Sequence, residues 1–129
     1  MMRYRAATHI APTVFDNVDP TMAIVREEIF GPVLVVQEFD TEEEALRLAD
    51  GTPYGLDGTV WTRDSGRARR MAHGIEAASV SIRSGGEEGP DLGIELSYEP
   101  QKASGFGAEA GLGGLQSYST LKFIQIMGA

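Results

Sequence analysis

Cysteine is absent from the 129 residues of this chain. Without a thiol the chain forms no disulfide, offers no thiolate-rich zinc site and carries no cysteine nucleophile of its own. Histidine is almost as scarce, because His9 and His73 are the only two, and they lie outside HExxH or any other metal-ligand spacing. The sequence therefore predicts no metal site, and both histidines are interpreted as structural or surface residues.

Long apolar runs and basic surface are also missing. No stretch has the length of a membrane-spanning helix or the pattern of a signal peptide, so we expect a cytoplasmic protein with no membrane partner. The formal net charge of -8 argues against nucleic-acid binding, since such proteins need a basic surface to displace counterions from phosphates. The one dense basic run, Arg67 to Arg70, is interpreted as a solvated helix face.

The rest of the composition is that of an ordinary globular protein. Hydrophobic residues make up 42% of the chain and charged residues 23%. A chain of this length can bury roughly two-thirds of its unfolded surface, so we expect one domain or part of one.

Strand-like and helix-like segments alternate from Pro32 onward. Strands are predicted at residues 33–39, 58–62 and 78–82. The first is a nearly continuous apolar run, "VLVVQEF", which is typical of a strand buried on both faces. The connections are long enough for parallel pairing, so the sequence predicts the α/β class with a parallel β-α-β-α-β sheet.

The two helices between these strands have start and stop signals. Thr41 with Glu44 forms a capping box for the first helix, which should end at Gly51, although Asp40 is an alternative cap. Asp64 caps the second helix, which should end at Gly74. Buried stripes are predicted at Ala45, Leu46, Leu48 and Ala49 in the first helix and at Ala68, Met71, Ala72 and Ile75 in the second. A short helix or turn should then lead to an apolar final strand at residues 121–127.

The segment "EEIFGP", Glu27 to Pro32, admits two interpretations. In the first, Gly31 and Pro32 make a corner that feeds the next strand, while Ile29 and Phe30 fill the core beside it. In the second, the Glu28 carboxylate accepts two hydrogen bonds from a ribose, and the Phe30 ring is an apolar wall for a nicotinamide. Glu28 and Phe30 would project to the same side if the segment were extended.

Four motifs in this order and spacing, "PTVFDNV", "EEIFGPV", "TPYGL" and "WTRD", carry a specific resemblance. With them, the chain resembles the C-terminal part of the NAD(P)-dependent aldehyde dehydrogenase family, from about Ala11 to Ile82 and again from Lys102 to Leu121. The resemblance implies a partial catalytic domain at residues 1–119 and an oligomerisation strand at residues 120–129.

The same resemblance implies a cofactor, NAD or NADP. It assigns Glu28 to the nicotinamide ribose and Phe30 to the side of the nicotinamide ring. It assigns no catalytic residue, because the family attacks its aldehyde with a cysteine thiolate and this chain has none. The dinucleotide-binding domain and the general-base glutamate of the family have no counterpart here either, so weak or absent cofactor binding is expected.

The chain departs from the family at three places. "SYEPQK" replaces the usual Pro-Phe-Gly-Gly turn before a lysine, Ile82-Arg83 replaces the usual Val-Asn at the end of the third strand, and "GGEEGP" replaces a segment that helps line the substrate entrance. Serines 79, 81 and 84 lie near that strand end, but no histidine or acid stands at a recognisable spacing to activate them. The substrate class therefore does not follow from the resemblance.

Three readings of function stay open. The chain is an inactive truncated aldehyde dehydrogenase, one subunit of a split enzyme completed by a complementary chain, or a non-catalytic module for self-association or for regulating a full-length relative. The apolar final strand predicts a homo-oligomer, since an uncovered apolar edge pairs readily with another chain.

Overall fold

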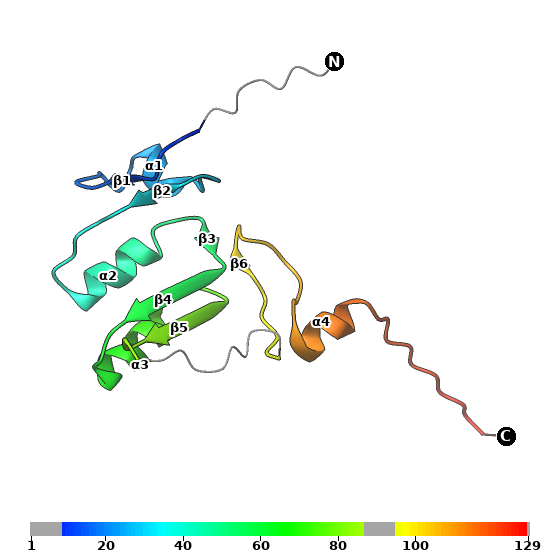
Figure 1. Cartoon of the computed structure of the whole chain (residues 1–129). Coiled ribbons are helices and arrows are strands. Elements are labelled where there is room, and N and C mark those ends of the chain that lie inside the picture. The colour runs from blue at the N-terminus through cyan, green and yellow to red at the C-terminus, as the bar shows by residue number, and fades with distance from the viewer. Residues whose placement is uncertain (1–8, 87–94, 129) are drawn as a thin grey trace, which may run out of the picture. The chain divides into compact units, whose positions relative to one another are not determined.

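The computed structural model describes residues 9–86 and 95–128. Contacts between residues divide the chain into two compact units, Met1–Thr52 and Pro53–Ala129. The described strands form three two-stranded sheets, two parallel and one antiparallel (Figure 1). The prediction of an α/β fold with parallel strands is confirmed, and the division at residue 119 stays a prediction.

The first unit contains two strands and two helices: β1 (Thr13–Phe15), α1 (Ala23–Arg26), β2 (Val33–Val35) and α2 (Glu42–Ala49). Strand β2 pairs in parallel with β1, from Thr13 opposite Val33 to Phe15 opposite Val35. Neither β1 nor α1 was predicted. The strand predicted at residues 33–39 is shorter, and it pairs with β1 rather than with the strand Asp57–Trp61 (β4).

Strand β2 is not buried on both faces, and that prediction is wrong. Val33 and Val35 are half-buried, while Leu34 between them is 59% exposed and Val14, its register partner on β1, is 64% exposed. An apolar run shows that both faces of a strand can be covered, but the covering layer has to come from other parts of a protein.

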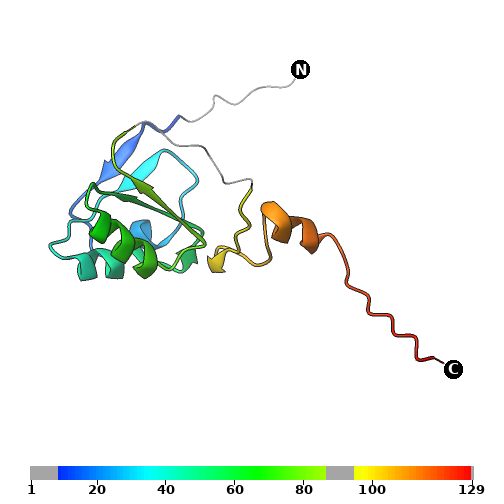
Figure 2. The ribbon, with the colours of Figure 1, turned by 90° about the horizontal axis from the view of Figure 1, so that it is seen from below.

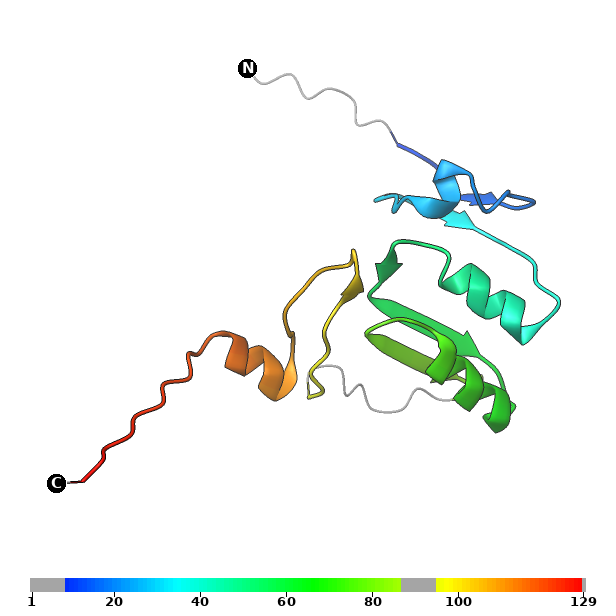
Figure 3. The same ribbon diagram turned by 180° about the vertical axis from the view of Figure 1, so that it is seen from behind.

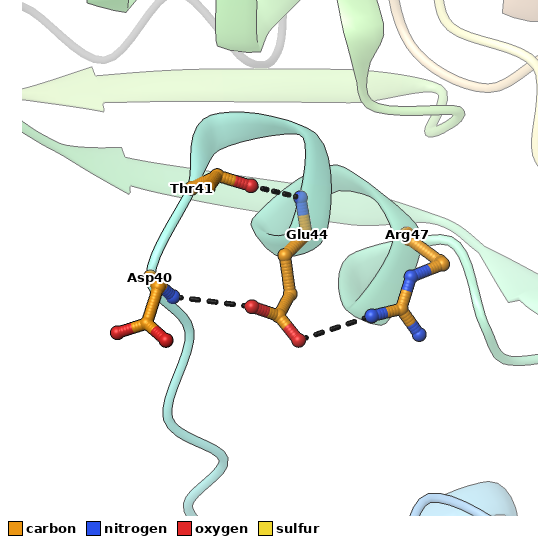
Figure 4. Close-up of polar contacts among 4 residues, drawn as sticks. All are labelled: Asp40, Thr41, Glu44 and Arg47. Carbon is orange, nitrogen blue, oxygen red and sulfur yellow. Dashed lines mark hydrogen bonds and ion pairs between the residues drawn. The ribbon is translucent and has the colours of Figure 1, made fainter.

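Helix α2 begins as its sequence predicts (Figure 4). The Glu44 amide donates to Thr41 Oγ1 at 3.1 Å, so Thr41 is the cap. The Glu44 carboxylate accepts from the Asp40 amide at 3.2 Å and also pairs with Arg47 at 3.0 Å. The reciprocal bond of the capping box thus goes to the residue before the cap. Of the predicted stripe, only Ala49 is exposed and the other three residues are half-buried.

The second unit contains the remaining elements: β3 (Tyr54–Gly55), β4 (Asp57–Trp61), α3 (Ser65–Gly74), β5 (Ser79–Arg83), β6 (Gln101–Lys102) and α4 (Gly111–Ser117). Strands β4 and β5 are parallel, from Asp57 opposite Ser79 to Trp61 opposite Arg83. Helix α3 connects them and contacts both, which confirms the predicted β-α-β unit (Figure 2).

Helix α3 supplies the packing of this unit. Its cap is confirmed, because the Arg67 amide donates to Asp64 Oδ1 at 2.8 Å. Met71 on this helix is 8% exposed, and it is the one buried hydrophobic side chain among residues 9–86 and 95–128. At the helix end, Ile75 Cγ2 lies 3.2 Å from where a Gly58 Cβ would stand, so the small residue lets helix and strand approach closely.

Strands β3 and β6 form a short antiparallel pair that the sequence did not predict (Figure 3). Gly55 in β3 is buried. A Cβ atom there would lie 2.5 Å from the Glu76 carbonyl oxygen and 2.9 Å from Gln101 Cβ. Only glycine fits at this crossing of three segments.

The predicted final strand is not formed within the described chain. Helix α4 ends at Ser117, and residues 119–128 follow without helix or strand and without a paired neighbour (Figure 3). Leu121 is 101% exposed, Phe123 86% and Ile126 89%. The alternating apolar pattern is present, but a strand exists only when a second strand accepts its backbone hydrogen bonds.

Candidate functional site

Glu28 and Phe30 lie in the loop between α1 and β2. On its amino side the Glu27 amide donates to the Ala23 carbonyl at 2.8 Å, which closes α1. On the other side the Gly31 amide donates to the Ile29 carbonyl at 2.9 Å, so Phe30 is the central residue of a three-residue turn. The backbone therefore bends at Phe30, and the extended segment expected from Glu28 to Phe30 is not observed.

Both predicted site residues face solvent. Phe30 is 94% exposed, and Glu28 is also exposed. Within the part of the chain that is described, no residue forms a hydrogen bond or ion pair with the Glu28 carboxylate. Phe30 does not plug a core, so the structural interpretation of this side chain is wrong for the chain as it stands. Its role and that of Glu28 in cofactor binding stay predictions.

Gly31 and Pro32 anchor this loop to the sheet, as the sequence predicted. The Val33 amide donates to the Gly31 carbonyl at 2.8 Å, and strand β2 begins at Val33. The Thr13 amide donates to the Pro32 carbonyl at 2.9 Å and continues the ladder between β1 and β2. The loop therefore projects two unengaged functional groups, a carboxylate and an aromatic ring, from a backbone that is tied at both ends.

A shallow groove of about 220 Å³ also belongs to the first unit. Its lining includes Asn17, Val36, Glu38, Glu44 and Arg47. Glu44 and Arg47 are paired with each other, and the Glu44 carboxylate also accepts from the Asp40 amide, so these two charged groups of the groove already stabilise the start of α2. Neither Glu28 nor Phe30 lines the groove, so it is separate from the predicted cofactor wall.

The serines near the end of the third predicted strand have one acid beside them that the sequence spacing missed. Ser79 donates a hydrogen bond to Asp57, because the parallel register places β4 Asp57 directly opposite. This carboxylate is the only side chain bonded to Ser79 among the described residues. A carboxylate without an imidazole between it and the hydroxyl does not make an activated serine nucleophile.

The carboxyl ends of β4 and β5 bring together three further residues that the sequence did not single out as a group. Arg83 lies opposite Trp61 in the register, with its Cζ atom 5.7 Å from the centre of the indole ring. Arg63 donates from Nε to the Ser84 carbonyl at 3.4 Å. The strand ends were a usable signal, because carboxyl ends of parallel strands meet at one edge of a sheet.

The segment "SYEPQK" makes specific contacts in place of the family turn. Tyr98 and Glu109 exchange backbone hydrogen bonds, and the Tyr98 hydroxyl donates to Glu109 Oε2 at 2.8 Å. This hydrogen bond raises the pKa of Tyr98, because the neighbouring carboxylate favours the protonated phenol. Ser97 Oγ accepts from the Gly113 amide at 2.7 Å. The segment therefore holds the start of α4 through its own side chains.

Lys102, at the end of the same segment, has a left-handed backbone with φ of 53°. Its Nζ lies 3.1 Å from Glu76 Oε2, and its side chain is 23% exposed. The neighbouring Ser104 hydroxyl accepts from the Gly55 amide at 2.9 Å. These contacts fix the β3–β6 crossing and stabilise the structure of the second unit.

The described ranges, 9–86 and 95–128, contain no group of three or more acidic or histidine side chains placed to hold a metal ion. They contain no helix with the length and apolar character needed to cross a bilayer.

The comparisons with known proteins agree on one family. The model of the aldehyde dehydrogenase family matches residues 2–124. The chain is 43% identical over 120 residues to the NADP/NAD-dependent aldehyde dehydrogenase PuuC of Escherichia coli (strain K12), covering 93% of this chain and 23% of that protein. It is 41% identical over 118 residues to betaine aldehyde dehydrogenase of Agrobacterium fabrum, covering 92% and 23%. The chain thus spans about a quarter of the length of these relatives.

Solved structures show the same likeness. Betaine aldehyde dehydrogenase (betB) of Staphylococcus aureus in complex with NAD+ matches with a TM-score of 0.73 and 40% identity, covering 83% of this chain and 20% of that one. Indole-3-acetaldehyde dehydrogenase of P. syringae in complex with NAD+ and IAA matches with a TM-score of 0.76 and 39% identity, covering 88% and 22%.

Proposed function

The chain belongs to the aldehyde dehydrogenase family, and from that premise we propose that it forms one wall of the nicotinamide site of an NAD(P)-dependent aldehyde dehydrogenase, without oxidising aldehydes by itself. The observation that carries this proposal is the pair of unengaged groups on the loop between α1 and β2, within a chain of this family that contains no cysteine. The chain would correspond to the latter part of the catalytic domain.

The described residues fit one end of such a cofactor. An exposed carboxylate at Glu28 can accept hydrogen bonds from both hydroxyls of a ribose, and the exposed ring of Phe30 offers a flat apolar surface. The backbone bonds around Gly31 and Pro32 hold both groups on one short loop. NAD or NADP bound there would supply the hydride acceptor for aldehyde oxidation.

The chain alone lacks the nucleophile that the reaction needs. In the family a thiolate attacks the aldehyde carbon, and the 129 residues present no thiol. Ser79 is not a substitute, since its described side-chain partner is Asp57 and not an imidazole. Aldehyde oxidation would therefore need a cysteine from another polypeptide segment, which is the split-enzyme reading.

Cofactor titration of the pure chain tests the proposal. One charged hydrogen-bonding group contributes roughly 1.5–3 kcal/mol, which is smaller than the general cost of association, so millimolar or weaker binding is expected. Glu28→Gln should weaken binding further, whereas Glu27→Gln, its exposed neighbour, is the matched control and should not. Submicromolar binding, or binding that Glu28→Gln leaves unchanged, would show that the ribose role is wrong.

An activity assay tests the second part of the proposal, that the chain does not oxidise aldehydes by itself. With a simple aldehyde and either NAD+ or NADP+, the pure chain should give no burst of reduced cofactor, because no residue forms the required thioester. A burst proportional to protein concentration would refute this. Adding a separately expressed relative that lacks the matching segment tests the split-enzyme reading, and recovered oxidation would favour it.

Self-association is a second candidate function, favoured by the exposure of the final segment. Leu121, Phe123 and Met127 alternate with Ile124 and Ile126, and all five are at least 70% exposed. An apolar segment with unpaired backbone groups is a template for pairing, and a symmetric dimer is its simplest outcome. Lysine at both isoleucines should lower the mass measured by light scattering, while Gln125→Lys, the control between them, should not. A monomeric wild-type chain at high concentration would contradict the idea.

A further inference from the structure

The groove of the first unit, about 220 Å³ in volume, lies at the carboxyl ends of a parallel strand pair. Asn17 lines it two residues after β1, and Gln37 and Glu38 line it two and three residues after β2. Helix α2 supplies the third wall. Ligands of parallel α/β sheets bind outside the carboxyl ends of the strands, so this groove occupies a position where a binding site is expected.

Three polar side chains of this groove are unpaired among residues 9–86 and 95–128. Neither the amides of Asn17 and Gln37 nor the carboxylate of Glu38 forms a hydrogen bond or ion pair with a described residue. Gln37 is half-buried, so its amide is already partly removed from water, and a ligand that bonds to it would replace the lost hydration. The groove therefore offers two amide oxygens and one carboxylate as acceptors.

Glu38 sets the charge of the groove. The lining contains two carboxylates, those of Glu38 and Glu44, and one guanidinium, that of Arg47. Glu44 and Arg47 neutralise each other at 3.0 Å (Figure 4), which leaves Glu38 as the uncompensated charge of the lining. A ligand that binds here should therefore carry a positive charge, in agreement with the net charge of -8 of the whole chain.

The remaining lining residues are apolar: Val18, Pro20, Val36 and Leu48. They offer a surface for methylene groups, whereas a bare metal ion would gain nothing from them. A volume of about 220 Å³ is smaller than the roughly 300–1,000 Å³ of pockets for drug-sized molecules. The groove therefore suits the charged end of a small ligand together with a short alkyl stem.

We propose that this groove binds a primary alkylammonium group, with Glu38 as its ion-pair partner. An ammonium has three N–H donors, and the Glu38 carboxylate with the amide oxygens of Asn17 and Gln37 supplies one acceptor for each. The alkyl stem would lie against the apolar walls. The site is separate from the predicted cofactor wall, so the inference goes beyond the proposed function.

Butylammonium chloride is the probe, added to the isotopically labelled intact chain at constant ionic strength and about pH 7, where the amine is protonated. The signals followed by NMR are the side-chain amide of Asn17, the only asparagine in the chain, and the backbone amides of Gln37 and Glu38. They should shift saturably with a dissociation constant in the millimolar range, because one exposed charge pair and a short stem contribute little. Butanol, which has the stem without the charge, should leave them in place.

Other cations separate an alkylammonium site from an inorganic cation site. Ammonium and potassium have the charge without the stem, and tetramethylammonium has methyl groups without an N–H donor. All three should bind at least about threefold more weakly than butylammonium. Equal binding of ammonium or potassium would overturn the proposal in favour of an inorganic cation, and equal binding of tetramethylammonium would show that the three acceptors are not used.

The variants assign the effect to residues. Glu38→Gln removes the charge and should weaken butylammonium binding at least about fivefold. Glu43→Gln is the matched control, because it removes the same charge from an exposed position on α2 that does not line the groove, and it should change the affinity less than about twofold. Asn17→Asp should strengthen binding, since it adds a carboxylate and aspartate tolerates the left-handed backbone at this position, with φ of 49°. The spectrum of each variant shows whether its fold is kept.

The proposal fails if Glu38→Gln leaves the affinity unchanged, if Glu43→Gln lowers it as much, or if butanol causes the same shifts. The first result means that Glu38 is not the partner, and the second means that general attraction by an acidic chain causes the shifts. A weaker affinity after Asn17→Asp would also contradict it. None of these results bears on the cofactor titration with Glu28→Gln, so the two proposals stand or fall separately.

Discussion

Two parallel strand pairs of the same kind occur in this chain, and they differ in what covers them. Strands β4 and β5 pair over five residues and carry helix α3, whose Met71 is buried. Strands β1 and β2 pair over three residues, and their facing residues Val14 and Leu34 are both mostly exposed. Two-stranded sheets have little stability of their own, so the difference lies in the packed layer and not in the strands.

The same comparison separates a packed connection from the one that carries the candidate site. The α3 crossover between β4 and β5 packs the pair, while the connection between β1 and β2 carries the exposed Glu28 and Phe30. We therefore expect residues 53–83 to hold their structure in isolation better than residues 9–36.

The largest expected effect is at the crossing of β3 and β6. Gly55→Ala would place a methyl group 2.5 Å from the Glu76 carbonyl oxygen, so the strands must separate. The free energy of unfolding of the second unit should fall by about 3 kcal/mol or more. Urea unfolding followed by Trp61 fluorescence measures this. Gly86→Ala, where a Cβ meets nothing within 4 Å, is the control and should cost less than about 0.5 kcal/mol.

A smaller effect is expected from one methionine in the packed pair. Met71→Ala should reduce stability by about 2–3 kcal/mol, because it leaves a cavity beneath α3. Leu34→Ala, at a position 59% exposed, should change stability by less than about 0.5 kcal/mol. Amide hydrogen exchange of the two strand pairs checks both variants. Equal protection of β1–β2 and β4–β5 in the wild-type chain would contradict the idea that the packed helix makes β4–β5 the more stable pair.

The smallest effect concerns pH and the start of α3. The hydrogen bond from the Arg67 amide lowers the pKa of Asp64. A lowered folded-state pKa gives stability that is present above the unfolded pKa and is lost as the pH falls through the folded one. The first turn of α3 should therefore fray in acid, below about pH 4.

The matched variant for this prediction is Asp64→Asn, which keeps a capping oxygen without a titrating group. Amide exchange in the first turn of α3, measured between about pH 2 and 7, should depend on pH more in the wild-type chain than in the variant. Identical profiles for the two chains would mean that the cap carries no pH dependence.

Much of the local structure was predictable from the sequence, because it depends on residues that lie close together along the chain. The caps at Thr41 and Asp64 were identified because a capping side chain bonds to an amide only three residues away. The β4–α3–β5 unit was predicted because its helix and strands each show their own period. The candidate residues Glu28 and Phe30 were found through a motif, and their solvent exposure suits a site that other groups complete.

Elements that depend on a distant partner were missed or misjudged. Strand β1 is three residues long and exists through its pairing with β2, about twenty positions later. The bond between Asp57 and Ser79 and the contact between Trp61 and Arg83 both follow from the register of β4 and β5. Register is set by how two segments meet, so neither contact could be found from spacing along one segment.

The sequence by itself determined the family, the caps of α2 and α3 and the loop that carries Glu28 and Phe30, because each depends on neighbouring residues or on a short motif. Only the tertiary structure decided which strands pair, which of two similar pairs acquires a packed helix, and that residues 121–127 stay unpaired. The physical reason is that hydrophobic burial and strand pairing require a second surface. An apolar pattern indicates which side chains can be covered, and the covering segment determines whether they are.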